Sequence, residues 1–218
     1  MKSISHIVAW ALIACAIPAW AEEPIKIGFL YLMSGRLATA GTTSKQGADL
    51  AIDEINEAGG INGRKIEGIF VDDKGDPTRA LREVRRLVEK DHVSAVMGVI
   101  SSDVALAISP ELNRLKIPFL VTSAQTPQIT GERCNRYTFR ITWSNNENLK
   151  TAVILAAKSK AKKWTTVGPD YVFGHEAWAA FQKHLKGVRP DVSFVSEKEA
   201  AFSPIETRDF SPYIKKVK

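Results

Sequence analysis

The stretch Val96-Met97-Gly98-Val99-Ile100-Ser101-Ser102-Asp103 is the strongest indication of the fold. The apolar run over 93–100 is typical of a buried strand, and it ends at two serines. Apolar residues at helical spacing follow at once, over 104–108. A strand that passes through two serines into a helix places two hydroxyls and several free backbone N–H groups at a helix N-terminus. Such a turn favours the binding of an anion, usually a carboxylate or a phosphate.

The same alternation of strand and helix extends on both sides of this stretch. Apolar patterns predict strands over 25–31, 65–71, 93–100 and 117–121, and helices from Thr42, from Asp76-Pro77 and after Ser102 to about Leu115. Four strands that alternate with three helices are typical of an α/β fold, with a parallel sheet covered on both faces. The sequence therefore predicts a doubly wound parallel sheet in this part of the chain.

The strand and helix pattern then restarts, which predicts a second α/β unit. Strands are expected over 137–142, 164–168 and 192–195, a helix over 147–158 capped by Ser144 or Asn145, another through Trp178, Phe181 and Leu185, a loop at Phe202-Ser203-Pro204 and a last helix over 210–217. The chain stops at Lys218, in the middle of this pattern. We expect one unit over 22–141 and a partial second unit over 142–218.

Topology places the candidate site. Right-handed crossovers bring the carboxyl ends of parallel strands to one edge of the sheet, and ligands bind outside that edge. The polar residues expected there are Ser34, Asp72, Asp73, Ser101, Ser102, Asp103 and those over 122–126. Hydroxyls predominate, which again favours an anionic ligand.

The N-terminus has the anatomy of a secretory signal peptide. Met1-Lys2 is a short basic start, 7–17 is an apolar segment, and Ala19-Trp20-Ala21 fits a cleavage site, so residues 1–21 are set aside from the fold and export is expected. A lipobox that ends at Cys15 is the alternative, and it would give a lipid-anchored protein. After cleavage the one remaining cysteine is Cys134, which excludes an internal disulfide and is expected to be a half-buried thiol.

Charge gives little indication of a partner. The formal net charge is +6, and the densest basic run lies over 158–163. Neither a nucleic-acid-binding module nor a basic face with interleaved aromatic residues is present, so no nucleic-acid partner is expected. Arg79, Arg82, Arg85 and Arg86 are interpreted as a solvated helix face. No sequence motif for a metal or cofactor is found, and none is expected.

In their order, ten short motifs resemble the branched-chain amino acid binding proteins, which are type I, leucine-binding-like periplasmic subunits of ABC importers. These motifs are Ile27-Gly28, Met33-Ser34-Gly35, Gly47-Ala48, Ile55-Asn56, Gly59-Gly60-Ile61-Asn62-Gly63, Asp72-Asp73 with Asp76-Pro77, 98–102, Thr122-Ser123-Ala124 with Thr126, Asp170-Tyr171-Val172-Phe173-Gly174 and 209–214. The resemblance implies two α/β lobes with a ligand cleft between them, a small-molecule ligand, an inner-membrane ABC permease as partner, and a monomer.

The resemblance also implies roles for particular residues. A serine that matches Ser102, and a loop that matches Ala124 and Thr126, hold the carboxylate and ammonium of the ligand, with Ser101 beside them. A ring that matches Phe173 closes over the ligand. Trp143 is an extra aromatic residue after the first crossing between lobes, and it is expected either to pack between the lobes or to line the pocket.

Two departures from the pattern bear on the ligand. Many amino-acid binders have tyrosine at the positions of Ala40 and Phe173. The acidic residue that meets the ligand ammonium in such binders would lie beyond Lys218. An aromatic acid or an amide-like ligand is therefore an alternative to an amino acid.

Three alternatives to an importer subunit stay open on the sequence alone. The same fold serves as a ligand-sensing receptor or an amide-responsive regulator. An exported hydrolase would need Ser101, Asp103 and a histidine as a triad, but no motif for such an enzyme is found, and we expect no catalytic activity. Because members of the resembling family are longer, a fragment or interrupted reading frame that binds ligand poorly is the third alternative.

Overall fold

The computed structural model describes residues 22–195 and 200–217. The predicted signal peptide and Cys15 lie outside the described residues. Within the described ranges, no helix has the length and apolar character that crossing a lipid bilayer requires.

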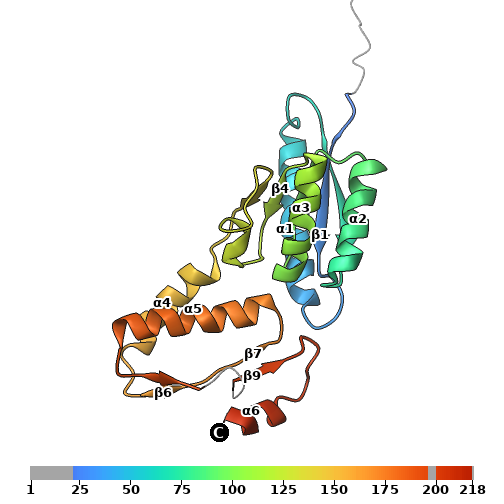
Figure 1. Ribbon diagram of the computed structural model, residues 1–218. Helices are drawn as coiled ribbons and strands as arrows, with labels where there is room; N and C mark the ends of the chain where they lie inside the picture. The colour runs from blue at the N-terminus through green and yellow to red at the C-terminus, as the bar shows by residue number, and fades with distance from the viewer. Residues whose placement is uncertain (1–21, 196–199, 218) are drawn as a thin grey trace, which may run out of the picture.

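A five-stranded parallel sheet forms the first part of the fold (Figure 1). Its elements are β1 (Ile25–Tyr31), α1 (Ala38–Glu57), β2 (Ile66–Asp72), α2 (Pro77–Glu89), β3 (Ala95–Gly98), α3 (Ser102–Leu115), β4 (Phe119–Val121), the short 3-10 helix η1 (Pro127–Ile129) and β5 (Thr138–Arg140). The strand order is β2-β1-β3-β4-β5, and all pairs are parallel. The predicted α/β fold class is thus confirmed. We call this part the first lobe.

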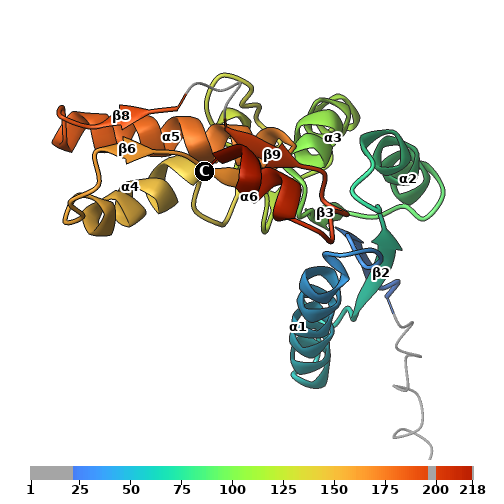
Figure 2. The ribbon, with the colours of Figure 1, turned by 90° about the horizontal axis from the view of Figure 1, so that it is seen from below.

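The two faces of this sheet are covered by different helices (Figure 2). Helix α1 lies on one face, and α2 and α3 lie on the other. Alternate residues of a strand point to opposite faces, so Leu30 and Val96 meet α2 and α3, while Phe29 and Tyr31 face α1. The fully buried core of the first lobe includes Leu30, Val84, Leu87, Val96, Val104, Ile108, Leu112 and Phe119.

Helix starts follow the predicted capping residues with one exception. The Asp76 carboxylate caps α2 by accepting hydrogen bonds from the N–H groups of Thr78 (2.8 Å) and Arg79 (3.1 Å). Helix α1 was predicted to begin at Thr42, and this is wrong, because it begins at Ala38. The small residues before Thr42 let the first turn lie on the backbone of Leu32, where a Cβ on Gly41 would come 2.0 Å from the Leu32 carbonyl oxygen.

The chain from α4 onwards forms a second lobe. Its elements are α4 (Asn145–Ala156), β6 (Lys163–Trp164), β7 (Val167–Pro169), α5 (Val172–Val188), β8 (Ser193–Phe194), β9 (Ala201–Ser203) and α6 (Ser211–Val217). Strands pair in parallel as β6-β8 and β7-β9. The predicted loop at Phe202 and Ser203 is wrong, because both lie in β9, where they pair with Gly168 and Pro169. The strand predicted over 164–168 is divided between β6 and β7.

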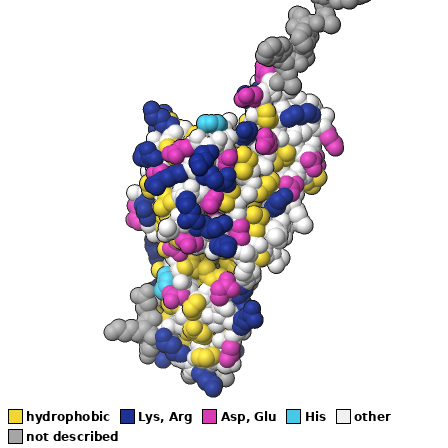
Figure 3. Space-filling model, turned by 90° about the vertical axis from the view of Figure 1, so that its right-hand side faces the viewer, with side chains coloured by type: hydrophobic (Ala, Val, Ile, Leu, Met, Phe, Trp, Pro, Cys, Tyr) yellow, Lys and Arg dark blue, Asp and Glu magenta, His cyan; other side chains and the backbone are white. Residues whose placement is uncertain are grey.

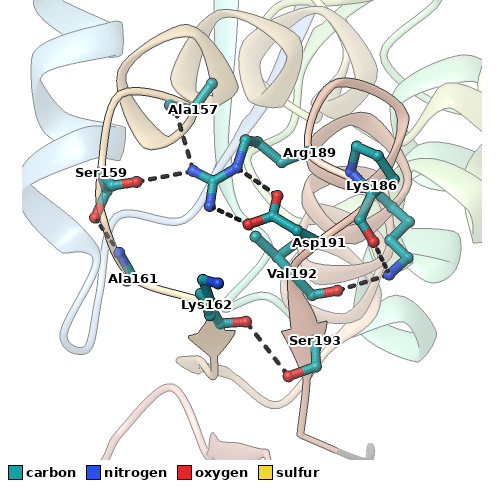
Figure 4. A network of polar contacts seen from close by, with 10 residues as sticks. Ala157, Ser159, Ala161, Lys162, Lys186, Arg189, Asp191, Val192 and Ser193 are labelled. Carbon is teal, nitrogen blue, oxygen red and sulfur yellow. Dashed lines mark hydrogen bonds and ion pairs between the residues drawn. The ribbon is translucent and has the colours of Figure 1, made fainter.

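Hydrogen bonds from Arg189 connect the C-terminal ends of α4 and α5 (Figure 4). Its Nη1 donates to the carbonyls of Ala157 (3.2 Å) and Ser159 (2.8 Å), just beyond α4, and its Nε and Nη2 reach the Asp191 carboxylate. The guanidinium therefore satisfies carbonyls that a helix C-terminus leaves without intrahelical partners. Hydrogen bonds from Arg189 hold the pKa of Asp191 well below its usual range, at about 2.

Charged side chains of both signs are interleaved on the face that carries α2 (Figure 3). Arg85 pairs with Glu111 of α3 (2.7 Å), and Arg86 pairs with Glu83 and Asp91. This pairing supports the interpretation of the α2 arginines as a solvated helix face. Cys134, expected to be half-buried, is instead exposed.

Candidate functional site

The carboxyl-end loops of the first-lobe sheet contact the start of α5 in the second lobe. Thr126 Oγ1 and Gln128 Nε2 both donate to Glu176 Oε1, at 2.8 and 2.7 Å. Val172, the first residue of α5, packs against the first-lobe core. We call the residues that meet here the lobe junction; they are Ser101, Ser102 and Asp103, the loop over 122–128, Asn145, and 171–176.

The turn from β3 into α3 depends on Gly98. This residue has φ +124°, and a Cβ would lie 2.2 Å from the Leu30 carbonyl oxygen. Val99 follows in the left-handed region, at φ +57°. The chain thereby leaves the sheet sharply, and Ser101 and Ser102 come to the start of α3, as the sequence predicted.

The two serines have different roles in the structure. Ser101 is the N-cap of α3, and its Oγ accepts a long hydrogen bond from Val104 N at 3.5 Å. Ser102 is the first residue of the helix and is fully buried. Its Oγ has no hydrogen-bond partner among the described residues. A buried hydroxyl without a partner costs free energy, so Ser102 is the serine with capacity left for a ligand.

The loop after β4 continues along β3 before it turns. The N–H groups of Thr122 and Ala124 donate to the carbonyls of Gly98 (3.0 Å) and Val99 (3.1 Å). Ala124 and Thr126 are fully buried. Thr126 Oγ1 also accepts from Gln128 N at 3.3 Å, which caps η1. The sequence prediction placed this loop beside the serines, and the bonds to Gly98 and Val99 hold it there.

Asn145 belongs to the junction, although the sequence indicated it only as a helix cap. The cap of α4 is Ser144, and Asn145 follows it, fully buried. Its backbone N–H donates to Gln125 O (2.8 Å) and its Nδ2 donates to Phe173 O (3.2 Å). Its Oδ1 is buried with no partner among the described residues. Its position directly after the crossing between the lobes was the signal that could have identified it.

Glu176 is the second junction residue that the sequence did not reveal. It is half-buried on α5, one turn beyond Val172, and its Oε2 is buried with no partner in the described part of the chain. Nothing in the local sequence distinguishes it from a solvated helix residue, because its partners lie about 50 positions earlier.

Phe173 lies between two cavities. A cavity of about 300 Å³ opens between the lobes, and its lining joins Arg36 and Leu37 of the first lobe to apolar and aromatic residues of the second, which include Tyr171, Phe173, Pro204, Ile205 and Phe210. The other, of about 360 Å³, lies inside the second lobe between α5 and the β6–β7 segment. The predicted position of Phe173 at a cleft between the lobes fits this geometry. Ser102, Ala124 and Thr126 line neither cavity and are fully buried.

A second set of contacts closes the other side of the interlobe cavity. Arg36 Nη1 donates to Thr207 O at 2.6 Å, and its guanidinium lies 5.2 Å from the centre of the Phe210 ring. Trp143 does not take part in these contacts. Its side chain is 65% exposed, so packing between the lobes is wrong for this residue, and a role in lining the pocket stays a prediction.

Asp72 and Asp73, at the end of β2, accept hydrogen bonds from nearby backbone N–H groups and are not part of the lobe junction. Asp72 Oδ1 accepts hydrogen bonds from Met33 N (2.9 Å) and Lys74 N (3.0 Å). Burial opposes ionisation of Asp72, but these bonds and one from Ser34 outweigh it and lower its pKa. Asp73 is fully buried, and burial raises its pKa to about 6. Neither lines the interlobe cavity.

The electrostatic character of the junction is mixed. The N-terminus of α3 carries the positive end of the helix dipole, which favours a negatively charged ligand group. Acceptor oxygens of Asn145 and Glu176 lie on the second-lobe side. Helices α3 and α5 are in contact. Burial raises the pKa of Tyr171, and the charge of Asp103 adds to the rise.

Comparison with known proteins indicates the family of this chain. A model of the periplasmic binding protein family matches residues 24–218. Leu/Ile/Val-binding protein homolog 7 of Brucella suis is 38% identical over 128 residues, which are 57% of this chain and 31% of that protein.

Solved structures of ABC transporter proteins are also similar. The substrate-binding protein LivJ of Streptococcus pneumoniae, solved with isoleucine, is 28% identical with a TM-score of 0.76 over 88% of this chain and 53% of that one. A solute-binding protein of R. palustris, solved with 4-hydroxybenzoate, is 27% identical with a TM-score of 0.77 over 89% of this chain and 50% of that one. This chain thus spans 31% of the curated relative and 50–53% of these two structures. The similarity to the Leu/Ile/Val-binding protein homolog and to LivJ supports a type I protein of the branched-chain amino acid family. Since the family model covers all but the first 23 residues, the chain belongs to the periplasmic binding protein family.

Proposed function

We propose that the protein is the periplasmic solute-binding component of an ABC importer, and that it captures a small carboxylate-bearing ligand between lobes formed by 22–141 and 142–218. The protein acts as a monomer and delivers its ligand to an inner-membrane permease. The observation that carries this proposal is the buried Ser102 hydroxyl, which has no partner among the described residues and lies at the N-terminus of α3.

A carboxylate suits this position on physical grounds. A neutral hydroxyl that donates to a charged oxygen contributes about 1.5–3 kcal/mol, more than it does to a neutral acceptor. The α3 dipole adds about 0.3–1 kcal/mol for an anion at its N-terminus. A hydrolase is not supported, because the Oγ of Ser101, its required nucleophile, caps α3 instead.

The interlobe cavity, which Ser102 does not line in this arrangement of the lobes, favours an apolar or aromatic ligand body. The interlobe cavity of about 300 Å³ has the size of a small-molecule site, and Tyr171, Phe173 and Phe210 supply rings to its lining. Among similar proteins, one was solved with isoleucine and another with 4-hydroxybenzoate. We infer a carboxylate-bearing ligand whose body is that of an amino acid, an aromatic acid or an amide-like compound.

Access to Ser102 requires the lobes to separate. Ser102 and Thr126 are fully buried, and hydrogen bonds from Thr126 and Gln128 to Glu176 and from Arg36 to Thr207 join the lobes in this arrangement. Movement about the segment between β5 and α4 would expose them to solvent. A ligand that touches both lobes then shifts the equilibrium toward the closed arrangement by its differential affinity for that state.

A thermal-shift screen tests this proposal. The mature protein is melted with amino acids, aromatic acids, amides and urea, each at a high concentration. A ligand at 100 times its Kd stabilises the folded state by about 2.7 kcal/mol, which raises Tm measurably. Benzoate and benzamide form a matched pair that differs at the carboxylate. We expect carboxylates to raise Tm and their neutral amide counterparts to have less effect, and equal effects would contradict the proposal.

A further inference from the structure

We propose that Arg36 is a latch between the lobes, which holds them together in the ligand-free protein and must release before a ligand enters the interlobe cavity. The latch consists of Arg36 in the first lobe and of Glu206, Thr207 and Phe210 in the second. This inference rests on the opening of the lobes in the proposed function, but it does not depend on which ligand binds.

Three contacts join Arg36 to the loop before α6. Its Nη1 donates to the Thr207 carbonyl at 2.6 Å, and its backbone N–H donates to Glu206 Oε1 at 3.3 Å. Its guanidinium lies over the face of the Phe210 ring, 5.2 Å from the ring centre, a distance at which a cation and an aromatic ring attract each other. One side chain therefore supplies two of the three contacts, and its removal should release most of the latch.

Gly35 makes room for the second-lobe loop. Its φ of +75° lies in the region that favours glycine, and a Cβ at this position would lie 2.7 Å from Glu206 Oε1. The absence of a side chain at Gly35 thus lets the Glu206 carboxylate reach the N–H of Arg36. This carboxylate also has the opposite charge to the Arg36 guanidinium, so the two lobes attract each other here.

The latch lies far from the segment about which the lobes would move. The chain crosses between the lobes at the start of α4, whereas the loop before α6 approaches the first lobe on the opposite side of the molecule (Figure 1 and Figure 2). For a given rotation, contacts far from a hinge separate by a larger distance than contacts near it. The contacts of Arg36 therefore break early when the lobes open, and they belong to the closed arrangement alone.

Arg36 also forms part of the wall of the interlobe cavity. It lines that cavity together with Leu37 and Phe210. It also lines a neighbouring polar cavity of about 330 Å³, whose other residues are Gly35, Glu206 and Arg208. Movement of the Arg36 side chain away from Phe210 would open this wall. The latch thus controls one side of the entrance to the interlobe cavity.

The strength of the latch suits a reversible contact. Glu206 is exposed, and charged contacts at a protein surface contribute only modestly to stability. Contacts that exist in one of two states shift the equilibrium between them by their own free energy. A hydrogen bond of ordinary net strength corresponds to about a two- to tenfold change in such an equilibrium. We expect Arg36→Ala to raise the ratio of open to closed protein by this factor.

Distance measurement by double electron–electron resonance tests the latch without any ligand. Spin labels are attached at Gln46→Cys on α1 and Lys215→Cys on α6, both exposed positions, after the exposed Cys134 is replaced by serine. We expect mainly one short distance in the wild-type mature protein and a larger share of longer distances in Arg36→Ala. The matched control is Arg208→Ala, which removes the same charge from an exposed residue of the loop before α6 and should resemble wild type.

Each outcome decides for or against the latch. A shift in Arg36→Ala that is absent in Arg208→Ala supports it. Unchanged distances in Arg36→Ala, an equal shift in Arg208→Ala, or a wild type that is already mainly open would overturn it. If Arg36→Ala does not fold, as judged by its melting transition, Phe210→Leu removes the ring contact instead, and unchanged distances in that variant would overturn the latch.

The result also stays separate from the test of the proposed function. A thermal-shift screen that finds no carboxylate ligand defeats the proposed function, and the distances of the ligand-free protein still decide on the latch. If a carboxylate ligand is found but the distances do not respond to Arg36→Ala, the latch alone is wrong.

Discussion

The Nδ2 of Asn145 donates a hydrogen bond to the backbone carbonyl of Phe173 at 3.2 Å, and so joins the start of α4 to the start of α5. Asn145→Ala removes this bond and leaves a carbonyl without its partner, which costs about 1–3 kcal/mol. We expect a loss of that size in the free energy of unfolding, measured by urea denaturation. Asn146→Ala, at the exposed neighbouring position, is the control and should change stability by less than about 0.5 kcal/mol.

Two glycines of α5 should respond in opposite ways to alanine. A Cβ on Gly174 would lie 1.9 Å from the Pro169 carbonyl oxygen, so Gly174→Ala must separate α5 from β7. Overpacking of this kind costs about 1–3 kcal/mol. Gly187 has no atom within 4 Å of its Cβ position, so Gly187→Ala should stabilise the helix by up to about 1 kcal/mol. Thermal melts of both variants measure these changes, and equal Tm values for the two variants would contradict the prediction.

Asp73 should make stability depend on pH. Burial raises its pKa to about 6, a rise opposed by the Gly75 N–H and increased by Asp72. The folded state therefore holds the proton more tightly than the unfolded chain does, and this contribution is present below about pH 4 and is lost as pH rises through about 6. Over that range the loss is at most roughly 3 kcal/mol.

Asp73→Asn removes this ionisation. The variant should gain stability relative to wild type between pH 4.5 and 7.5, as followed by urea denaturation at both values. Asp53→Asn, on the exposed face of α1, is the control and should track wild type. A constant difference between Asp73→Asn and wild type across this range would show that Asp73 does not titrate there.

Sequence patterns predicted the elements whose structure is determined locally. The apolar run before Ser101 became β3, and the Asp76-Pro77 pair capped α2, because strand periodicity and helix capping depend on neighbouring residues. Topology then placed Ser102 and the 122–126 loop on one edge of the sheet. By contrast, β9 was missed, because its pairing with β7 is a contact between segments more than 30 positions apart.

Local sequence also failed to reveal two residues of the lobe junction. Asn145 and Glu176 became identifiable once their partners were known, and those partners lie 20 to 50 positions away in the chain. The exposed position of Trp143 was equally unpredictable, because composition indicates that an indole favours burial but does not indicate which surface covers it.

We predict that Ser101 contributes mainly to stability and Ser102 mainly to ligand binding, although the two residues are neighbours. Ser101→Ala removes the N-cap of α3 and should lower the free energy of unfolding by about 1 kcal/mol. Ser102→Ala removes no hydrogen bond among the described residues, so its stability should change little. Urea denaturation of the two variants measures this difference, and a larger loss for Ser102→Ala would contradict these roles.

The most direct test is a calorimetric titration of wild type and Ser102→Ala with the carboxylate ligand that raises Tm most. The Ser102 hydroxyl is proposed to donate to the ligand carboxylate, so its loss should weaken binding by about 1.5–3 kcal/mol, or roughly 10- to 150-fold in Kd. The same titration with Ser101→Ala should change Kd much less. Unchanged affinity in Ser102→Ala would contradict the account.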